Sequence, residues 1–427
     1  MGAKKQEVHK FAEPAFPLRA GGNGRYLVDE EDRPFFYHAD TAWRMCMRLK
    51  PDQLTHYLKD RKAKGFNALH VHSINKEKQG MANVYGDNPF DPEADLLSPN
   101  EPYWRYLDEV VTLIEEHGFL LCLSAVWFGY HGVGGRQSLS PDNARAYGEF
   151  LGARYRSHNN IVWILGGDND PSPDKHEDTC EQARGIRDAA PHHLLTFHPG
   201  PEHSSATFFH HQPWLDLTMG YTYVEAYLQI AAEYQCPVPH RPIVLAETGY
   251  EGESNTGFVW TPYWIRRQMY WALLSGACGC ANGNGVVWHL GEGWEDALDM
   301  EATLQMSHVR SLFESLPWWT LVPDVHHNLV TRGYGNFGRG DYAGAAVAED
   351  GSCGVVYLPV PGAIEVDMEC FSSEVAVRWM DPTSGVYLQV SDQPLPSRGT
   401  RSFQPPPRNS KGEGDWLLVF GGEDSTG

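Results

Sequence analysis

The sequence lacks the features that mark membrane, exported and nucleic-acid-binding proteins. No run of about 18 uninterrupted apolar residues is present, which argues against a membrane span. The basic N-terminal residues are followed by no apolar stretch, so no signal peptide is predicted and a cytoplasmic protein is expected. Acidic residues dominate, with a formal net charge of −21. This balance argues against nucleic acid or an anionic membrane as a partner.

Two cofactor signatures are also missing. The eight cysteines form no CxxC pair, and Cys122 sits inside an apolar, strand-like run. This usage is typical of reduced, structural thiols and argues against a zinc site built on cysteine. No glycine-rich phosphate loop follows the first predicted strand, which argues against an open dinucleotide-binding sheet. We therefore expect no cofactor and no metal.

Aromatic residues, by contrast, are abundant. The chain of 427 residues contains 14 tryptophans and 20 tyrosines. Aromatic rings stack on the apolar faces of sugar rings, so this enrichment favours a carbohydrate substrate.

Apolar strand-like runs alternate with amphipathic helical patterns through the first three quarters of the chain. The predicted strands cover residues 34–43, 67–74, 119–127, 160–168, 194–200, 214–223, 241–251 and 285–290. The predicted helices cover residues 51–66, 101–118, 141–158, 177–190, 224–234, 262–278 and 301–315. Eight strands that alternate with helices over this total length predict a (β/α)8 barrel, a TIM barrel.

The pattern changes near residue 325 to short alternating runs separated by Gly, Pro, Ser and Asp. Such runs predict a small antiparallel β-sandwich. We therefore expect a catalytic barrel at 34–322 and a sandwich at 323–427. The N-terminal segment at 1–33 is expected to form a β-hairpin that packs on the C-terminal domain or on the barrel. The sequence leaves open whether the chain forms a homo-oligomer.

Two of the predicted strands end on a carboxylate. The run NIVWILGGD ends at Asp168, and RPIVLAE ends at Glu247. Barrel enzymes place their chemistry at the carboxyl ends of the strands, so both side chains are expected at one site. A pair of close carboxyls is the requirement for retaining hydrolysis of a glycosidic bond. In that interpretation Asp168 is the acid/base, Glu247 is the nucleophile, and Gly166 and Gly167 let the substrate approach the backbone.

Each carboxylate also has an ordinary structural interpretation. Asp168 lies in the turn-rich segment GDNDPSPD and would suit a turn or a helix N-cap. Glu247 would suit a buried partner of an arginine, although a glutamate directly after IVLA is costly unless it is used or paired.

Other polar and aromatic residues at strand ends are candidates for the substrate pocket. Asp40 is expected either to bind a sugar hydroxyl or to cap a turn, and Tyr250 either to hold the Glu247 carboxylate or to lie at the surface. The full set of substrate-binding candidates is Asp40, Trp43, His72, Trp127, His198, Tyr223, Tyr250 and Trp288.

Two histidines suggest a different class of enzyme. His70 and His72 are two residues apart on a predicted strand and therefore share a face, which is the spacing of metal ligands in barrel hydrolases. A metal-dependent hydrolase is thus one alternative. A carbohydrate-binding protein without catalytic activity is another.

The order of these motifs resembles that of a known family, the apiosidase-like barrels of glycoside hydrolase family 140. The opening segment FFYHADTAWRMCMRLKPDQLTHYLKDRKAKGFNAL is similar to the family's first strand and helix. NIVWILGGDND is similar to the segment that bears the acid/base, and RPIVLAETGYEG to the one that bears the nucleophile. HLLTFHPGPEHSSATFF matches a further segment, and VRWMDPTSGVY with DWLLVF resembles the appended sandwich named for collagen binding. The resemblance implies a glycoside hydrolase with Asp168 and Glu247 in those roles.

The sequence departs from the family pattern at two places. TMGYTY stands where the family commonly has Q-S-G-H, and Ala39 replaces the usual glycine of the first motif. The first change lies where a substrate hydroxyl would be recognised, so the resemblance does not extend to specificity for apiose.

Overall fold

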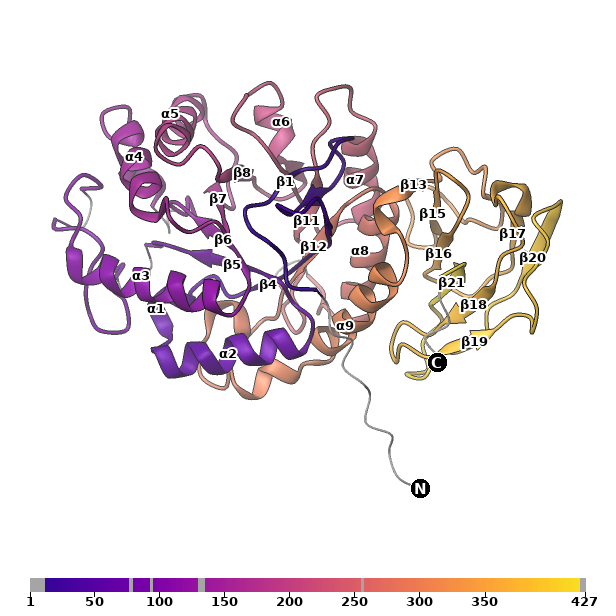
Figure 1. Ribbon diagram of the computed structural model, residues 1–427. Helices are drawn as coiled ribbons and strands as arrows, with labels where there is room; N and C mark the ends of the chain where they lie inside the picture. The colour runs from indigo at the N-terminus through magenta and orange to yellow at the C-terminus, as the bar shows by residue number, and fades with distance from the viewer. Residues whose placement is uncertain (1–11, 77–79, 93–94, 130–134, 255–256, 423–427) are drawn as a thin grey trace.

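A computed structural model describes residues 12–76, 80–92, 95–129, 135–254 and 257–422. Its main sheet is a nearly closed barrel at the left of Figure 1. The parallel strands are β4 (Tyr37–Thr41), β5 (Ala68–His72), β6 (Leu120–Ser124), β7 (Ile161–Gly166), β8 (Leu194–His198), β10 (Thr218–Tyr221), β11 (Ile243–Glu247) and β12 (Gly279–Asn282). The predicted TIM barrel is confirmed.

Hydrogen bonding runs in the order β8-β7-β6-β5-β4-β12-β11-β10, and the short β9 (His203–Ser204) pairs antiparallel with β10. No ladder joins β8 to β10 among the described residues, yet the Asp216 N–H donates to the Leu195 carbonyl at 2.9 Å beside this seam. The barrel strands are almost wholly buried, which explains their continuous apolar runs.

Helices surround the barrel (Figure 1). They are α1 (Met45–Arg48), α2 (Pro51–Ala63), α3 (Glu101–Glu116), α4 (Ala144–Tyr155), α5 (Pro173–Ala189), α6 (Ser205–Phe209), α7 (Ala226–Tyr234), α8 (Pro262–Leu274) and α9 (Glu301–Glu314). Proline occupies the first turn of α2, α3, α5 and α8, where its missing N–H removes no intrahelical hydrogen bond. None of the described helices is long and apolar enough to cross a membrane.

The prediction of the last barrel strand was wrong. Residues 285–290 do not form it; the 3-10 helix η2 (Val287–His289) lies there, and β12 comes earlier in the chain. The small side chains of β12 have a steric cause, because a Cβ on Gly279 would lie 1.9 Å from the carbonyl oxygen of Tyr37 on the paired strand. Because the strands pack closely here, β12 has small residues in place of the bulky ones by which strands are usually recognised.

The C-terminal part contains two antiparallel sheets, shown at the right of Figure 1. The larger has the order β13 (Leu321–Pro323), β15 (Gly344–Ala348), β16 (Gly354–Leu358), β21 (Trp416–Phe420), β18 (Val377–Met380) and β19 (Tyr387–Gln389). The smaller comprises β14 (Val330–Arg332), β17 (Ile364–Asp367) and β20 (Thr400–Phe403). The predicted sandwich is confirmed.

The described part of the N-terminal segment contributes two strands, β1 (Arg19–Ala20) and β2 (Leu27–Val28), to a three-stranded antiparallel sheet. The third strand, β3 (Pro34–Phe35), follows the segment directly. The first eleven residues of the predicted 1–33 segment lie outside the described residues.

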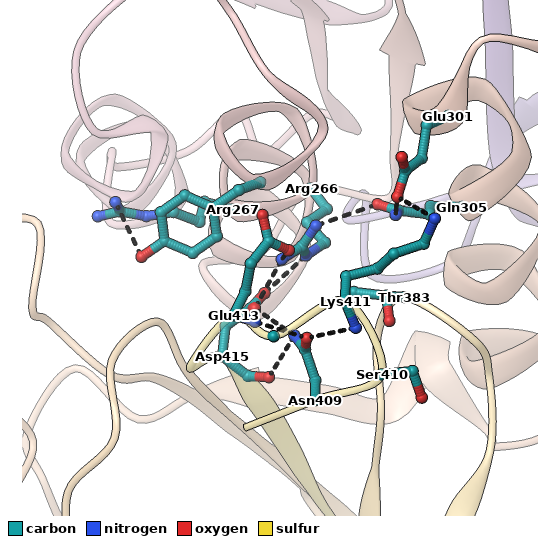
Figure 2. Close-up of polar contacts among 12 residues, drawn as sticks. Arg266, Arg267, Glu301, Gln305, Thr383, Asn409, Ser410, Lys411, Glu413 and Asp415 are labelled. Atoms are coloured by element: carbon teal, nitrogen blue, oxygen red, sulfur yellow. Dashed lines mark hydrogen bonds and ion pairs between the residues drawn. The ribbon is translucent and has the colours of Figure 1, made fainter. Parts of the chain in front are cut away.

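Helix α8 joins β11 to the sandwich. On one side, Gln268 donates a hydrogen bond to the hydroxyl of Thr248 at 3.1 Å, directly after β11. On the other, the fully buried Arg266 donates to both carboxylate oxygens of Asp415, at 2.7 and 2.6 Å, as Figure 2 shows. Asn409 and Tyr357 also donate to Asp415, at 2.9 and 3.0 Å. Barrel and sandwich therefore share a buried, hydrogen-bonded ion pair.

Candidate active site

A cavity of about 560 Å³ opens at the carboxyl ends of the barrel strands. It is lined by Trp43, Arg44, His72, Asn75, Trp127, Gly129, Asp168, Pro201, Tyr221, Tyr223, Glu247, Tyr250, Glu253, Ser254 and Trp288. Every predicted site residue except Asp40 and His198 is in this lining. The sequence analysis did not select Arg44, Asn75, Tyr221 or Glu253, although each follows or ends a predicted strand closely.

Asp168 and Glu247 lie close together in the cavity. A carboxylate oxygen of each and a ring nitrogen of His198 all lie within 4.8 Å of one another. Asp168 follows β7 and Glu247 ends β11, so two strands separated in the sheet order converge on one point. The arrangement provides two carboxyls that can act on the same substrate atom.

Asp168 has an unusual backbone conformation. Its φ of +55° is in the left-handed region, which residues other than glycine seldom adopt. The indole N–H of Trp127 donates to its carboxyl at 3.2 Å. Burial, reinforced by nearby Glu247, raises the pKa of Asp168 to about 7. A carboxyl that holds a proton near neutral pH is suited to general acid catalysis.

The glycines before Asp168 have a steric cause in the packing of two aromatic rings. A Cβ on Gly167 would lie 2.3 Å from the ring of Trp127, and one on Gly166 would lie 2.2 Å from the ring of Phe197. Both residues also have positive φ angles, +122° and +74°. They make room for these aromatic rings, and thereby let the indole of Trp127 lie against Asp168.

Glu247 is 8% exposed and is surrounded by hydrogen-bond donors. Burial raises its pKa to about 8, while hydrogen bonds from Tyr250 and Tyr221 act in the opposite direction. The indole N–H of Trp43 donates to the Tyr250 hydroxyl at 2.9 Å, which directs the hydroxyl proton of Tyr250 toward the carboxylate. This chain of donors offsets part of the effect of burial, and a nucleophile acts from the ionised form that these donors stabilise.

His198 lies beneath the cavity lining, in contact with Glu247. It is fully buried and does not line the cavity, but its Nε2 lies 3.1 Å from a carboxylate oxygen of Glu247. We predicted that His198 contacts the substrate, whereas in the structure it contacts Glu247.

Asp40 also lies outside the cavity lining, in place of the predicted contact with a sugar. Its carboxylate is fully buried and accepts hydrogen bonds from Tyr57 at 2.7 Å and Asn282 at 3.0 Å. Arg61 lies 3.5 Å away. Asp40 therefore connects β4 to α2 and to the neighbouring β12.

His70 and His72, the metal ligands of the alternative interpretation, contact different surroundings. His70 contacts the Tyr37 hydroxyl at 2.5 Å inside the barrel, whereas His72 lines the cavity. In the part of the chain that the structure describes, neither belongs to a group of three close His, Cys, Asp or Glu side chains. Asp168, His198 and Glu247 form one such group, so a metal ion would have to compete with the substrate for both carboxylates.

Comparison with known proteins agrees with this geometry. Residues 22–320 match the family model described as "Apiosidase-like, catalytic domain". Residues 334–421 match "Putative collagen-binding domain of a collagenase". The chain therefore belongs to the apiosidase-like family and is a glycoside hydrolase. Among curated proteins, none matches the sequence.

Two solved structures resemble nearly the whole chain. One, described as a glycoside hydrolase, is 25% identical with a TM-score of 0.84 and covers 97% of this chain and 98% of its own. The other, a glycoside hydrolase family 5 protein from Bacteroides vulgatus, is also 25% identical with a TM-score of 0.84, over 95% of this chain and 93% of its own. The likeness includes both the barrel and the sandwich.

Proposed function

We propose that this protein is a retaining O-glycoside hydrolase that acts on a small oligosaccharide or glycoside. The proposal depends on one observation, the approach of the Asp168 and Glu247 carboxylate oxygens to within 4.8 Å in the cavity. Retaining enzymes hold their carboxyl groups about 5–5.5 Å apart, whereas inverting enzymes separate them by about 6.5–9.5 Å to admit a water molecule. A cavity of about 560 Å³ is in the range of small-ligand sites.

The reaction proceeds in two displacements. Asp168 gives its proton to the glycosidic oxygen while the Glu247 carboxylate attacks the anomeric carbon, so the leaving alcohol departs and a glycosyl ester forms on Glu247. The Asp168 carboxylate then takes a proton from water, and the hydroxide attacks the same carbon. The sugar is released with its original configuration, and both carboxyls return to their starting states.

The roles are tested with two variants and a panel of aryl glycosides. Glu247→Gln should abolish turnover while the fold persists, because the amide cannot form the glycosyl ester. Asp168→Asn should slow glycosides with poor leaving groups most, since those need the proton. With a dinitrophenyl leaving group and added azide, Asp168→Asn should yield a glycosyl azide of retained configuration.

Three results would refute these assignments. Activity of Glu247→Gln within about tenfold of the wild type would exclude Glu247 as the nucleophile, since removal of an essential nucleophile costs far more. Equal losses by Asp168→Asn on good and poor leaving groups, without an azide product, would exclude Asp168 as the acid. A product of inverted configuration would exclude double displacement.

A further inference from the structure

One wall of the cavity carries polar atoms without hydrogen-bond partners among the described residues. They are both ring nitrogens of His72, which is 2% exposed, and the side-chain oxygen of Asn75, which is 6% exposed. Leaving a buried polar atom unpaired costs about 1–3 kcal/mol, so native structures seldom gather several. Both residues line the cavity at the end of β5. These atoms therefore indicate a ligand that supplies their missing partners.

The imidazole of His72 is held by aromatic rings. Its ring centroid lies 4.9 Å from that of Trp43 and 4.4 Å from that of Trp127. Burial and the nearby Arg44 guanidinium keep the pKa of His72 well below its ordinary value, so the ring is neutral. A neutral imidazole offers one donor and one acceptor, and the Asn75 oxygen adds a second acceptor. The wall is thus polar but uncharged.

This set of atoms complements hydroxyl groups. A hydroxyl both donates and accepts, so two of them can pair with the two acceptors and the donor of this wall. A carboxylate accepts only, and it would meet Asp168, Glu247 and Glu253 in the same cavity. Arg44 is the cationic side chain of the lining, and it packs over the ring of Trp288 at 4.8 Å. The charge of the cavity therefore disfavours an acidic sugar.

We propose that His72 and Asn75 recognise free hydroxyls of a neutral sugar bound beside Asp168 and Glu247. This inference rests on the proposed function and narrows it to a class of substrate. The two residues are specificity determinants: they select neutral, unsubstituted sugars over uronic acids and over sugars that lack the hydroxyls they bind.

The test measures binding to Glu247→Gln by calorimetry, so it needs no turnover. The probes are p-nitrophenyl glycosides of neutral hexoses and pentoses, the corresponding glycosiduronates, and monodeoxy analogues of whichever neutral glycoside binds. We expect the neutral glycoside to bind, the uronate to bind at least about tenfold more weakly, and one or two deoxy analogues to lose about tenfold each.

Substitutions assign the hydroxyls to residues. His72→Phe keeps an aromatic ring between Trp43 and Trp127 but removes both nitrogens, and Asn75→Leu removes the amide at similar volume. Each should reduce the affinity ratio of parent to deoxy sugar to near one for the hydroxyl it binds. His70→Asn, on the same strand but outside the cavity lining, should leave this ratio unchanged.

The inference is overturned if no glycoside binds, if uronates bind as tightly as neutral sugars, or if neither variant changes the parent-to-deoxy ratio. Its failure is distinguishable from failure of the proposed function. Neutral glycosides that bind through His72 but are not cleaved by the wild type would refute hydrolysis alone. Cleavage with unchanged discrimination in both variants would refute hydroxyl recognition alone.

Discussion

His198 places its Nε2 3.1 Å from the Glu247 carboxylate while its Nδ1 faces the Pro199 carbonyl oxygen, also at 3.1 Å. A carbonyl oxygen only accepts, so Nδ1 carries a proton. The contact between Nε2 and the carboxylate is then attractive only when a proton lies between them. Glu247 and His198 therefore bind protons as a pair, in a site where Asp168 binds another.

This arrangement predicts the pH dependence of activity. The active form has Glu247 ionised and Asp168 protonated, and burial raises both pKa values, to about 8 and about 7. Because the pKa of Glu247 is the higher one, the proton of the singly protonated pair lies mainly on Glu247, and the active form is the minor one of the two. The singly protonated pair is most populated between these values, so kcat/KM should be highest between about pH 7 and 8 and fall on both sides. Initial rates from pH 5 to 10 measure this, and an optimum below pH 6 would contradict it.

The acid limb should respond to Trp127. Its indole N–H donates to Asp168 at 3.2 Å and stabilises the carboxylate form. Trp127→Phe removes this donor and keeps a ring, so the pKa of Asp168, the lower of the two, should rise toward that of Glu247. The acid limb should then move up by about half to one pH unit. Trp288→Phe is the matched control, because its N–H donates to Glu253 instead, at 2.7 Å. Equal shifts in both variants would contradict a specific effect of Trp127.

Glu247 should lower the stability of the fold at alkaline pH. Its folded pKa of about 8 exceeds its ordinary value of 4.5, so the fold favours the protonated form, and stability falls as the pH rises through this window. Glu247→Gln removes the buried charge and should raise the Tm at pH 9 by roughly 2–5 °C, with little change at pH 4. Thermal unfolding at the two pH values measures the difference. A gain independent of pH would point to packing instead.

Chelation should leave activity unchanged. Asp168, His198 and Glu247 could ligate an ion, but the proposed mechanism uses both carboxylates and needs Glu247 free for attack. Prolonged dialysis against a chelator, with circular dichroism as a control for folding, tests this. A loss of activity that zinc or manganese restores would favour the metal-dependent alternative.

The ion pair between barrel and sandwich should be essential for stability. Arg266→Met would leave Asp415 buried without its cation and should cost about 3–5 kcal/mol in urea unfolding. Adding Asp415→Asn should recover part of that loss. Lys411→Met is the matched control, since the Lys411–Glu301 pair is exposed and should contribute under about 1 kcal/mol. Equal losses for Arg266→Met and Lys411→Met would contradict this account.

The sequence predicted the residues that come directly after apolar strands. Asp168 and Glu247 were found because a carboxylate that ends a buried run needs an explanation, and the regular alternation of strands and helices predicted the barrel. Trp43, Trp127 and Trp288 were found in the same way. The spacing of apolar residues and the type of residue that follows a strand are local properties, so they can be read from a single sequence.

The errors concern contacts between distant segments. Asp40 ends a strand as Asp168 does, yet Tyr57 and Asn282 from other elements surround it. Position 167 has no room for a side chain because the ring of Trp127, forty residues earlier in the chain, lies against it. β12 was missed because the close approach of the neighbouring strand β4 requires small residues there, and small residues do not form a recognisable strand pattern. Such positions depend on tertiary packing, which local pattern does not encode.

The buried ion pair between Arg266 and Asp415 has a consequence for the evolution and engineering of this protein. The sandwich is joined through this ion pair to α8, the helix that follows β11. It therefore cannot be replaced as an independent domain. A chimaera that replaced this tail would have to supply a carboxylate for Arg266 or neutralise that arginine. In this lineage the two folds are expected to diversify together, with substitutions in α8 and in the loop around residue 410 occurring in concert.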